Sequence, residues 1–567
     1  TYHWTCKKIV SWFLKMIASK KSFIVIIFFL SSLIFFTSCD NDPNQSAAFT
    51  GVRVIDNSYS PPVVRINEGG KVRFNNWGNN PHNVIAVDET WGSYEEIPKG
   101  DYLDISYEVE GLYKYLCSFH ASPDGEWGMV GSVVVGDINY EDYTNFSKMD
   151  VVPSFSGSVR NVPDDYETIQ DAVNASNPGD LVLIKPGIYY EEVVVNVPSI
   201  TIRGWDRNNT IIDGEFERGN GVLVAGVDGV VIENITARNA LLNGFYWATV
   251  KGYRGSYLTA YNNGDYGVYA FDAVDGVLEH SYASGSPDAG FYIGQCYPCD
   301  AIVNNVISEN NGLGYSGTNS GGSLYIISSV FRNNKGGLAP NTLDSELLPP
   351  ERETFIIGNL IENNNNNDAP ATKSTYLSFG NGVIIAGGNN NIIKNNVIAN
   401  HDLYGVILTA AADVNYWPAH GNRVEDNLIL SSNRADMAIS GVSNLGNCFK
   451  GNYFNTSIPP GLQSLNNCDA GYIPLSSDLS GMWSSLARII HASDGGYQQG
   501  DWRSFPKPES QPNMPIMEKL LNQGYDKKNL PTYMIRKSVK PAVEVFQQFE
   551  DVLNDIELPE EARNYLN

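Results

Sequence analysis

Short apolar runs that alternate with polar residues fill residues 51–136, with turn residues between the runs. Examples are Val63–Ile66, Lys71–Phe74, Ile105–Val109 and Val133–Val135. Successive side chains of a strand point to opposite faces, so this alternation indicates strands with one buried face. Several such strands separated by turns predict a small β-sandwich.

A second pattern follows an acidic, proline-containing stretch at 137–163, which we interpret as a linker. Glycines recur every 23 residues (244 − 221, 267 − 244 and 290 − 267), and each begins an apolar run such as GVLV, GFYW, GVYA or GFYI. A repeat of this length predicts a solenoid in which each coil packs on the next. The repeat places the solenoid at 164–470. The sandwich and the solenoid together predict an all-β fold class for the whole chain.

Three segments of this second part depart from the repeat. Tyr166–Ser176 has the spacing of a short amphipathic helix. Residues 338–380 contain Pro349-Pro350 and polar clusters, which predict an inserted loop on one face. Residues 471–567 are rich in proline and charge and include an expected helix near 543–553, so we expect a tail that caps or wraps the solenoid.

The N-terminal segment reads as a targeting signal. Lys20 and Lys21 precede an apolar run of 14 residues (36 − 23 + 1), which ends in Thr37-Ser38-Cys39. The run is too short to span a bilayer and resembles the signal peptide and lipobox of bacterial lipoproteins. This resemblance implies a signal peptide at 1–39, starting at Met16 if residues 1–15 are not translated, lipidation of Cys39 and a tether at 40–50. An ordinary signal peptide is the alternative.

The net charge of the protein limits the kinds of partner that it is expected to bind. Removal of residues 1–39 takes away five lysines and no acid, which leaves 33 basic and 63 acidic residues (38 − 5 = 33) and a net charge of −30 (33 − 63). A chain this acidic is not expected to bind nucleic acid. An anionic polysaccharide is repelled as well unless Ca²⁺ bridges it. The expected location is the bacterial cell envelope, lipid-anchored and facing the periplasm or the cell surface.

Two cysteine pairs close in sequence are candidates for disulfides in an exported protein: Cys296 with Cys299, and Cys448 with Cys468. The CxxC pair also fits a redox motif, but that motif works at a helix N-terminus and this one lies in a predicted turn of the solenoid. Cys117 has no partner of this kind, and metal ligation accounts for an unpaired thiol in such a protein.

Cys117 and three further residues are candidate ligands for a mononuclear copper ion. His120 lies three residues away, Met129 follows in the same segment, and His82 comes from a distant strand end. One thiolate, two imidazoles and a weak thioether suit copper in both oxidation states. The alternatives are that the axial ligand is water, a backbone oxygen or absent, and that the histidines are structural. A saturated site of this kind transfers electrons and leaves no position for a substrate.

These segments resemble a known family. FNNWGNNPHNVIAVDE and GLYKYLCSFH…GMVGSVVV resemble the two signature segments of plastocyanins and halocyanins, over residues 51–136. The resemblance implies a cupredoxin domain with one type I copper, ligated by His82, Cys117, His120 and Met129, and it implies that Asn83 braces the ligand loop. Eight residues, 121–128, separate His120 from Met129, which is longer than the family's usual loop, so Met129 is the least secure ligand.

The solenoid carries a second resemblance. Segments such as GVVIENITARN and NNIIKNNVIANH resemble right-handed parallel β-helix proteins, including pectate-lyase-like folds, and imply asparagine ladders at the turns. Tyr266-Gly267 and Asp272 keep only fragments of an alginate-epimerase motif, and we identify no catalytic constellation. The aromatic side chains fit sugar stacking if they are exposed, but we favour stacking inside the coils; they are Tyr246, Trp247, Tyr253, Tyr257, Tyr261, Tyr266 and Tyr269.

Two functions follow from these observations. The first is an envelope-anchored electron carrier with a type I copper, a redox partner protein and a β-helix that docks a protein or glycan. The alternative is a β-helix that binds or modifies a polysaccharide, with the cupredoxin as an accessory module. A purely structural surface protein is a third interpretation. The complete set of candidate copper ligands argues against it.

Overall fold

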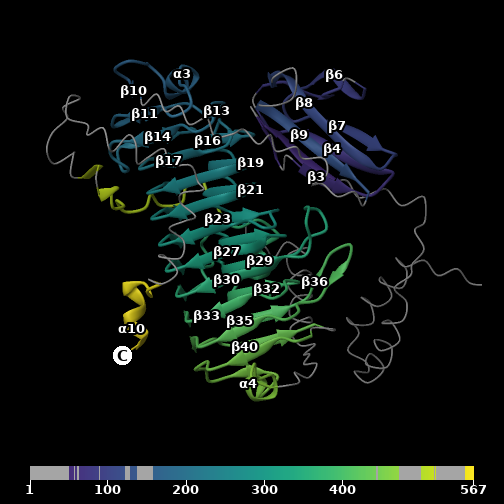
Figure 1. Cartoon of the computed structure of the whole chain (residues 1–567), viewed down its shortest axis with the longest axis vertical. Helices are drawn as coiled ribbons and strands as arrows, with labels where there is room; N and C mark the ends of the chain where they lie inside the picture. The colour runs from purple at the N-terminus through teal and green to yellow at the C-terminus, as the bar shows by residue number, and fades with distance from the viewer. Residues whose placement is uncertain are drawn as a thin grey trace, which may run out of the picture. The chain divides into compact units, whose positions relative to one another are not determined.

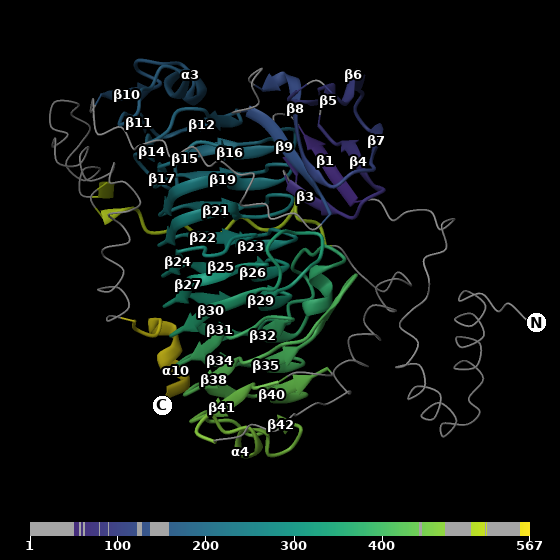
Figure 2. The same cartoon turned by 45° about the vertical axis from the view of Figure 1, so that its right-hand side comes forward.

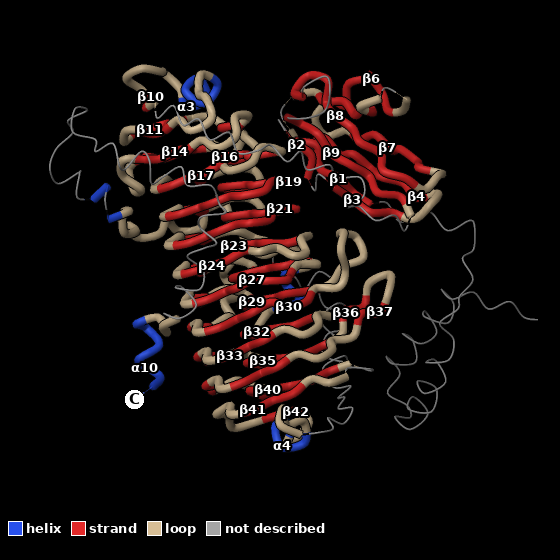
Figure 3. Tube along the Cα trace, viewed as in Figure 1, coloured by secondary structure: helices blue, strands red, loops and turns tan. Residues whose placement is uncertain are grey.

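Strands make up most of the regular structure (Figure 3). The structure is a computed structural model. It describes residues 50–136 except 56–57, 61–62, 79, 89 and 122–127; 158–470 except 442–444; 500–518 except 516; and 556–566. The expected signal peptide, Cys39, the tether and the helix expected at 543–553 lie outside these residues. No described helix has the length and apolarity that a membrane crossing requires.

The first part is a sandwich of two sheets, with strand orders β2-β1-β4-β7 and β3-β9-β8-β5-β6. Its strands are β1 (Thr50–Ile55), β2 (Ser58–Ser60), β3 (Val63–Ile66), β4 (Gly70–Asn76), β5 (His82–Ala86), β6 (Gly92–Ile97), β7 (Tyr102–Tyr107), β8 (Gly111–Ala121) and β9 (Gly128–Val135). Alternate residues such as Val72, Phe74, Val133 and Val135 form the core between the sheets. The predicted alternation is therefore the alternation of buried and outward side chains.

The second part is a parallel β-helix whose coils stack along one axis (Figures 1 and 2). Among the described residues, 21 strands form one sheet: β10 (Val159–Val162), β11 (Leu181–Ile184), β13 (Val193–Val195), β14 (Thr201–Gly204), β16 (Asn220–Ala225), β17 (Val230–Glu233), β19 (Asn243–Ser256), β21 (Val268–Glu279), β23 (Ala289–Gly294), β24 (Ala301–Asn304), β26 (Leu313–Thr318), β27 (Gly321–Ile327), β29 (Gly336–Asn341), β30 (Arg352–Ile357), β32 (Asn381–Ala386), β33 (Ile392–Lys394), β35 (Tyr404–Thr409), β38 (Arg423–Glu425), β40 (Ala435–Ser440), β41 (Cys448–Lys450) and β42 (Ser457–Ile458).

A second, 10-stranded sheet runs beside it in the described part of the chain (Figure 2). Its strands are β12 (Gly187–Tyr189), β15 (Thr210–Asp213), β18 (Thr236–Arg238), β20 (Thr259–Tyr261), β22 (Tyr282–Ser284), β25 (Ile307–Glu309), β28 (Val330–Arg332), β31 (Leu360–Glu362), β34 (Val397–Ala399) and β39 (Leu428–Leu430). The short pieces are α3 (Ile169–Asn174), η2 (Thr375–Ser378), β36 (Ala411–Ala412), β37 (Tyr416–Trp417), α4 (Leu462–Leu465), η4 (Glu560–Ala562) and α10 (Arg563–Leu566).

The 23-residue period is set by close backbone contact between coils. Phe245 pairs with Val268, and Val268 pairs with Phe291, so one period of 23 residues moves the chain one coil along the axis. A Cβ added to Gly221 would lie 2.5 Å from the carbonyl oxygen of Gly244, and one added to Gly244 would lie 2.6 Å from that of Gly267. Glycine recurs at this position because no side chain fits between the coils.

Asparagine side chains form ladders inside the turns. Asn396 donates from Nδ2 to Asn427 Oδ1 at 2.9 Å, and its Oδ1 accepts from the backbone N–H of Asn359 at 2.9 Å. A second ladder runs from Asn311 through Asn334 and Asn364 and ends on the buried His401. These ladders satisfy turn amides that the coils bury.

His401 replaces an asparagine in its ladder as a neutral ring. Its Nδ1 accepts from the backbone N–H of Asn364 at 3.3 Å, while Nε2 faces the carbonyl of Ile361. Burial lowers the pKa of His401 to about 4, so the ring is uncharged at neutral pH and can accept this bond.

Two segments differ from the sequence interpretation, and a third agrees with it. β10 lies inside the stretch interpreted as a linker at 137–163 and pairs with β11. The expected inserted loop at 338–380 contains two strands, β30 and β31, which complete the coil begun by β29 and lie between two shorter loops. The amphipathic helix is α3, which starts at the N-cap Thr168 and buries Ile169 and Val173 against the first coils.

Parts of the C-terminal tail contact the solenoid. The guanidinium of Arg207 donates to the carbonyl of Pro512 at 3.0 Å, and the backbone N–H of Met514 donates to Asn234 Oδ1 at 2.8 Å. Near the end of the chain, Tyr565 Oη donates to the carboxylate of Glu362. The segments 500–518 and 556–566 therefore cover turns of the β-helix.

Candidate metal centre and surfaces of the β-helix

The register of the second sandwich sheet brings His82 and Cys117 together. β5 begins at His82 and pairs antiparallel with β8, with Ile85 opposite Leu116, so Cys117 reaches the start of β5. The Cys117 Sγ lies 3.8 Å from His82 Nδ1, and both side chains are fully buried. Cys117 belongs to neither of the described disulfides, so a soft donor and an imidazole meet at one buried point.

The other two predicted ligands lie on the adjoining segments. Met129 is in β9, fully buried, and belongs to the same core cluster as Cys117. His120 lies near the end of β8, but its side chain and the loop residues 122–127 lie outside what the structure describes. β8 pairs with β9 in one register from Gly111 to Leu116, and the register shifts before Ala121, which faces Gly128.

Asn83 ties the two ligand strands together. Its Nδ2 donates to Ser118 Oγ at 2.8 Å, and its Oδ1 accepts from the backbone N–H of Ser118 at 2.9 Å. Tyr59 Oη donates to the carbonyl of Asn83 at 2.5 Å and packs edge-on against Tyr115. The sequence pointed to Asn83, whereas Tyr59 gave no signal because it is 24 residues away in another sheet.

The four remaining described cysteines form two disulfides, Cys296–Cys299 and Cys448–Cys468. The first is buried in the turn between β23 and β24. Glu425 lies beside the second, with a carboxylate oxygen within 4.8 Å of both sulfurs. Because these sulfurs are bonded to each other, they are not thiolate ligands, and this group does not form a metal site.

The aromatic residues divide between the inside and the outside of the coils. Trp247 and Tyr253 lie inside, as expected from core stacking. Tyr246 and Tyr269 instead point outward and stack at 4.6 Å between ring centroids, and Tyr292 meets Tyr269 edge-on at 4.8 Å. We name Tyr246, Tyr269 and Tyr292 the tyrosine ladder. The prediction that these rings stack inside the coils is therefore wrong for Tyr246 and Tyr269. Their rings are nevertheless buried.

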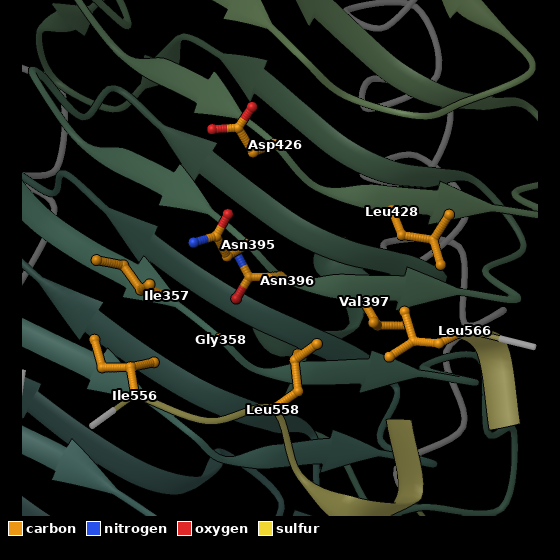
Figure 4. Close-up of a pocket in the computed structure, with 10 residues that line it drawn as sticks. All are labelled: Ile357, Gly358, Asn395, Asn396, Val397, Asp426, Leu428, Ile556, Leu558 and Leu566. Atoms are coloured by element: carbon orange, nitrogen blue, oxygen red, sulfur yellow. The ribbon is translucent and has the colours of Figure 1, made fainter. Parts of the chain in front are cut away.

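A pocket of about 550 Å³ lies between the β-helix and the C-terminal segment (Figure 4). Figure 4 shows a mainly apolar wall with Asn395 and Asp426 near it. Among the described lining residues Asp426 is the one ionisable group, and it faces Lys394 at 3.5 Å. The lining thus lacks a second acid for glycoside hydrolysis. It comprises Ile357, Gly358, Asn395, Asn396, Val397, Asp426, Leu428, Ile556, Leu558 and Leu566.

Comparison with known families places a right-handed β-helix region at residues 201–347. This match lies wholly in the solenoid, so it supports the β-helix on which the polysaccharide interpretation depends, and it does not reach the sandwich at residues 51–136. No curated protein matches the chain.

Three solved structures are similar to parts of the chain. A purple cupredoxin from Nitrosopumilus maritimus is 29% identical, covering 15% of this chain and 99% of its own, with a TM-score of 0.14. A mutant of amicyanin is 24% identical, over 16% and 86%, with a TM-score of 0.14. The A-module of a mannuronan C-5 epimerase from Azotobacter vinelandii is 18% identical, over 51% and 92%, with a TM-score of 0.37. TM-scores this low carry no argument about function.

Proposed function

We propose that the sandwich is a cupredoxin domain that binds one type I copper ion and transfers electrons. The observation that carries the proposal is the buried pair of Cys117 Sγ and His82 Nδ1 at 3.8 Å. A fully buried thiol beside an imidazole, with a buried thioether in the same cluster, is the donor set that suits copper. His82, Cys117, His120 and Met129 would hold the ion.

The residues of the chain then have distinct tasks. Bound copper supplies a one-electron couple, in which Cu(II) accepts one electron and becomes Cu(I). Asn83 and Tyr59 hold β5 and β8 at a fixed separation, which keeps the donors in place in both oxidation states. The tight packing around Cys117 and Met129 excludes water and substrate. The proposed role is thus electron exchange with a redox partner protein, without bond chemistry.

Titration of the full chain with Cu(II) tests this proposal. We expect a strong visible band from thiolate-to-copper charge transfer that saturates at about one ion per chain. Reduction should bleach the band, and reoxidation should restore it. Binding without a visible band, or saturation at several ions, would contradict a type I site.

The location of the protein is part of the same proposal. We infer that Cys39 carries the lipid anchor and that the protein faces the periplasm or the cell surface of a bacterium. The apolar run before Cys39 and the lipobox-like residues support this inference. An exported location also suits the two disulfides, because an oxidising compartment maintains them.

A second candidate function is the binding or modification of a polysaccharide by the β-helix. The family match at 201–347 supports it as a fold that presents long, regular surfaces. Incubation of the full chain with neutral and anionic polysaccharides, with and without Ca²⁺, tests it by co-sedimentation and by product analysis. The net charge of −30 predicts that anionic chains bind only with Ca²⁺. Failure of every polysaccharide in the panel to bind or change would exclude this function.

A further inference from the structure

The sandwich and the β-helix share one apolar cluster. Val63 of β3 and Val134 of β9 point out of the sandwich and pack with the tyrosine ladder. Leu347, from the loop that follows β29, joins the same cluster. Val134 and Leu347 are 0% exposed, so this contact excludes water from the tyrosines.

Charged groups line the same contact. Arg53 of β1 forms an ion pair with Asp265, whose side chain is 5% exposed, and its guanidinium lies 5.5 Å from the ring centroid of Trp77. Asp288 lies one coil further along, where its backbone N–H donates to the carbonyl of Asp265. Glu346 accepts a hydrogen bond from Tyr292 Oη at 2.8 Å. We name Arg53, Asp265, Asp288 and Glu346 the junction cluster.

The junction cluster contains three carboxyl groups and one cation. If all three carboxyls were ionised, the water-poor contact would hold two uncompensated negative charges, which is costly in a medium of low polarity. Burial, together with the nearby charge of Asp265, raises the pKa of Asp288 to about 7. Burial, with a contribution from Asp288, raises the pKa of Glu346 to about 8.

Other titratable groups around these two carboxyls do not remove the imbalance. Asp288 faces Arg53, Asp265 and Tyr266, and Glu346 faces Tyr292 and Asp288. Burial raises the pKa values of Tyr246, Tyr266, Tyr269 and Tyr292 well above their usual range, so these phenols stay neutral. The described surroundings of Tyr246 add Asp272, a further carboxyl.

The contact also holds buried polar atoms without a partner. Among the described residues, Tyr246 Oη and Gln295 Nε2 have no hydrogen-bond partner, although Gln295 is fully buried and its Oε1 accepts from the backbone N–H of Leu347 at 2.8 Å. Unsatisfied groups of this kind weaken a closed contact, because water can bond to them once the contact opens. The junction therefore combines a strong apolar contact with polar groups that are better solvated when it opens.

We propose that the contact between the sandwich and the β-helix is a proton-dependent latch, closed while Asp288 and Glu346 carry protons and opened by their ionisation. In the open form both carboxyls are in water and ionise with ordinary pKa values near 4, so the closed form binds more protons. Closure therefore becomes less favourable as the pH rises from about 4 to about 8. Between the pKa values of a carboxyl in the open and the closed form, that carboxyl lowers the equilibrium constant for closure by about tenfold per pH unit. Above this range both forms are ionised and the dependence ends.

Hydroxyl-radical footprinting of the full chain tests the latch, because it reports the solvent exposure of individual side chains. Between pH about 5 and pH about 9, we expect oxidation of Tyr246 and Tyr269 to increase about fivefold. Exposed Tyr453 measures the radical dose in each sample. Trp247, inside the coil, should stay protected at both pH values and so shows that the solenoid remains folded.

Two variants make the test specific. Asp288→Asn with Glu346→Gln keeps both positions neutral, so Tyr269 should stay protected at both pH values. Glu351→Gln is the matched control, because burial also raises the pKa of Glu351 to about 8 but its carboxylate bonds Thr354 and Asn391 inside the solenoid. That variant should open as the wild type does. Equal protection of Tyr269 in the wild type at both pH values, or opening of the double variant, would overturn the proposal.

Discussion

We expect replacement of Cys117 with alanine to abolish the visible band of the proposed Cu(II) site and to leave no copper on the protein after dialysis. The thiolate is the donor that creates the charge-transfer band, and it is the strongest ligand for Cu(I). Because Cys117 is fully buried beside His82, no surface cysteine can substitute for it. Absorption spectra and the copper content after dialysis measure both effects. Near-complete loss of the band is expected, since two imidazoles and a thioether bind Cu(II) without strong colour.

Met129→Leu is the matched control for this experiment. Leucine fills a similar volume in the core cluster but offers no sulfur, so the fold is kept while the axial ligand is lost. We expect the coloured site to persist with a higher reduction potential, because the axial ligand tunes a type I site without creating it. A Cys117→Ala protein that keeps the band, or a Met129→Leu protein that loses copper altogether, would contradict the ligand assignment.

The sandwich could be predicted from its alternating pattern, and so could the meeting of His82 with Cys117. Two features of the sequence predicted that His82 and Cys117 meet: a thiol without a disulfide partner and a histidine at the start of a strand. The place of Met129 in the core was predicted less securely, because the length of a loop does not determine where the following strand pairs. The role of Tyr59 could not be predicted, since a tyrosine hydroxyl bound to the carbonyl of Asn83 leaves no sequence pattern.

In the β-helix, regular spacing predicted the coils that obey it and missed those that do not. Leu338 pairs with Val383 of the next coil, a separation of 45 residues (383 − 338) instead of 23, because the coil of β29, β30 and β31 has longer turns after β29 and after β31. The strands β30 and β31 of that coil are flanked by proline and asparagine clusters, which favour a loop interpretation. Spacing reports the distance between coils only where the turns have constant length.

Contacts between distant parts of the chain could not be predicted from the sequence. Arg53 and Asp265 are 212 residues apart, and neither belongs to a motif. The outward direction of Tyr246 and Tyr269 follows from strand alternation, but their burial depends on Val63, Val134 and Leu347, which other segments supply. Exposure of an outward side chain therefore cannot be inferred from the strand that carries it.

The paired asparagines have two different roles that the sequence does not separate. In the pairs Asn333-Asn334 and Asn395-Asn396, the first residue has a positive φ, 54° and 55°, and turns the chain. The second residue points inward and joins a ladder. Asparagine suits the first role because its short side chain tolerates the left-handed conformation, and the second because its amide both donates and accepts.

Replacement of Asn396 with alanine should lower the free energy of unfolding of the β-helix by about 4 kcal/mol, because a buried hydrogen bond contributes about 1 kcal/mol and four are lost. Its Nδ2 donates to Ile356 O and Asn427 Oδ1, and its Oδ1 accepts from the backbone N–H and the Nδ2 of Asn359. Urea unfolding of the full chain, followed by far-UV circular dichroism, measures the change.

The neighbouring residue provides the control, because Asn395 is exposed and serves only the turn (Figure 4). Glycine adopts a positive φ without strain, so Asn395→Gly should change the free energy of unfolding by less than about 1 kcal/mol. The two variants thus separate the amide ladder from the turn conformation. Equal losses in both would mean that the backbone conformation, rather than the hydrogen bonds of the ladder, stabilises the stack of coils.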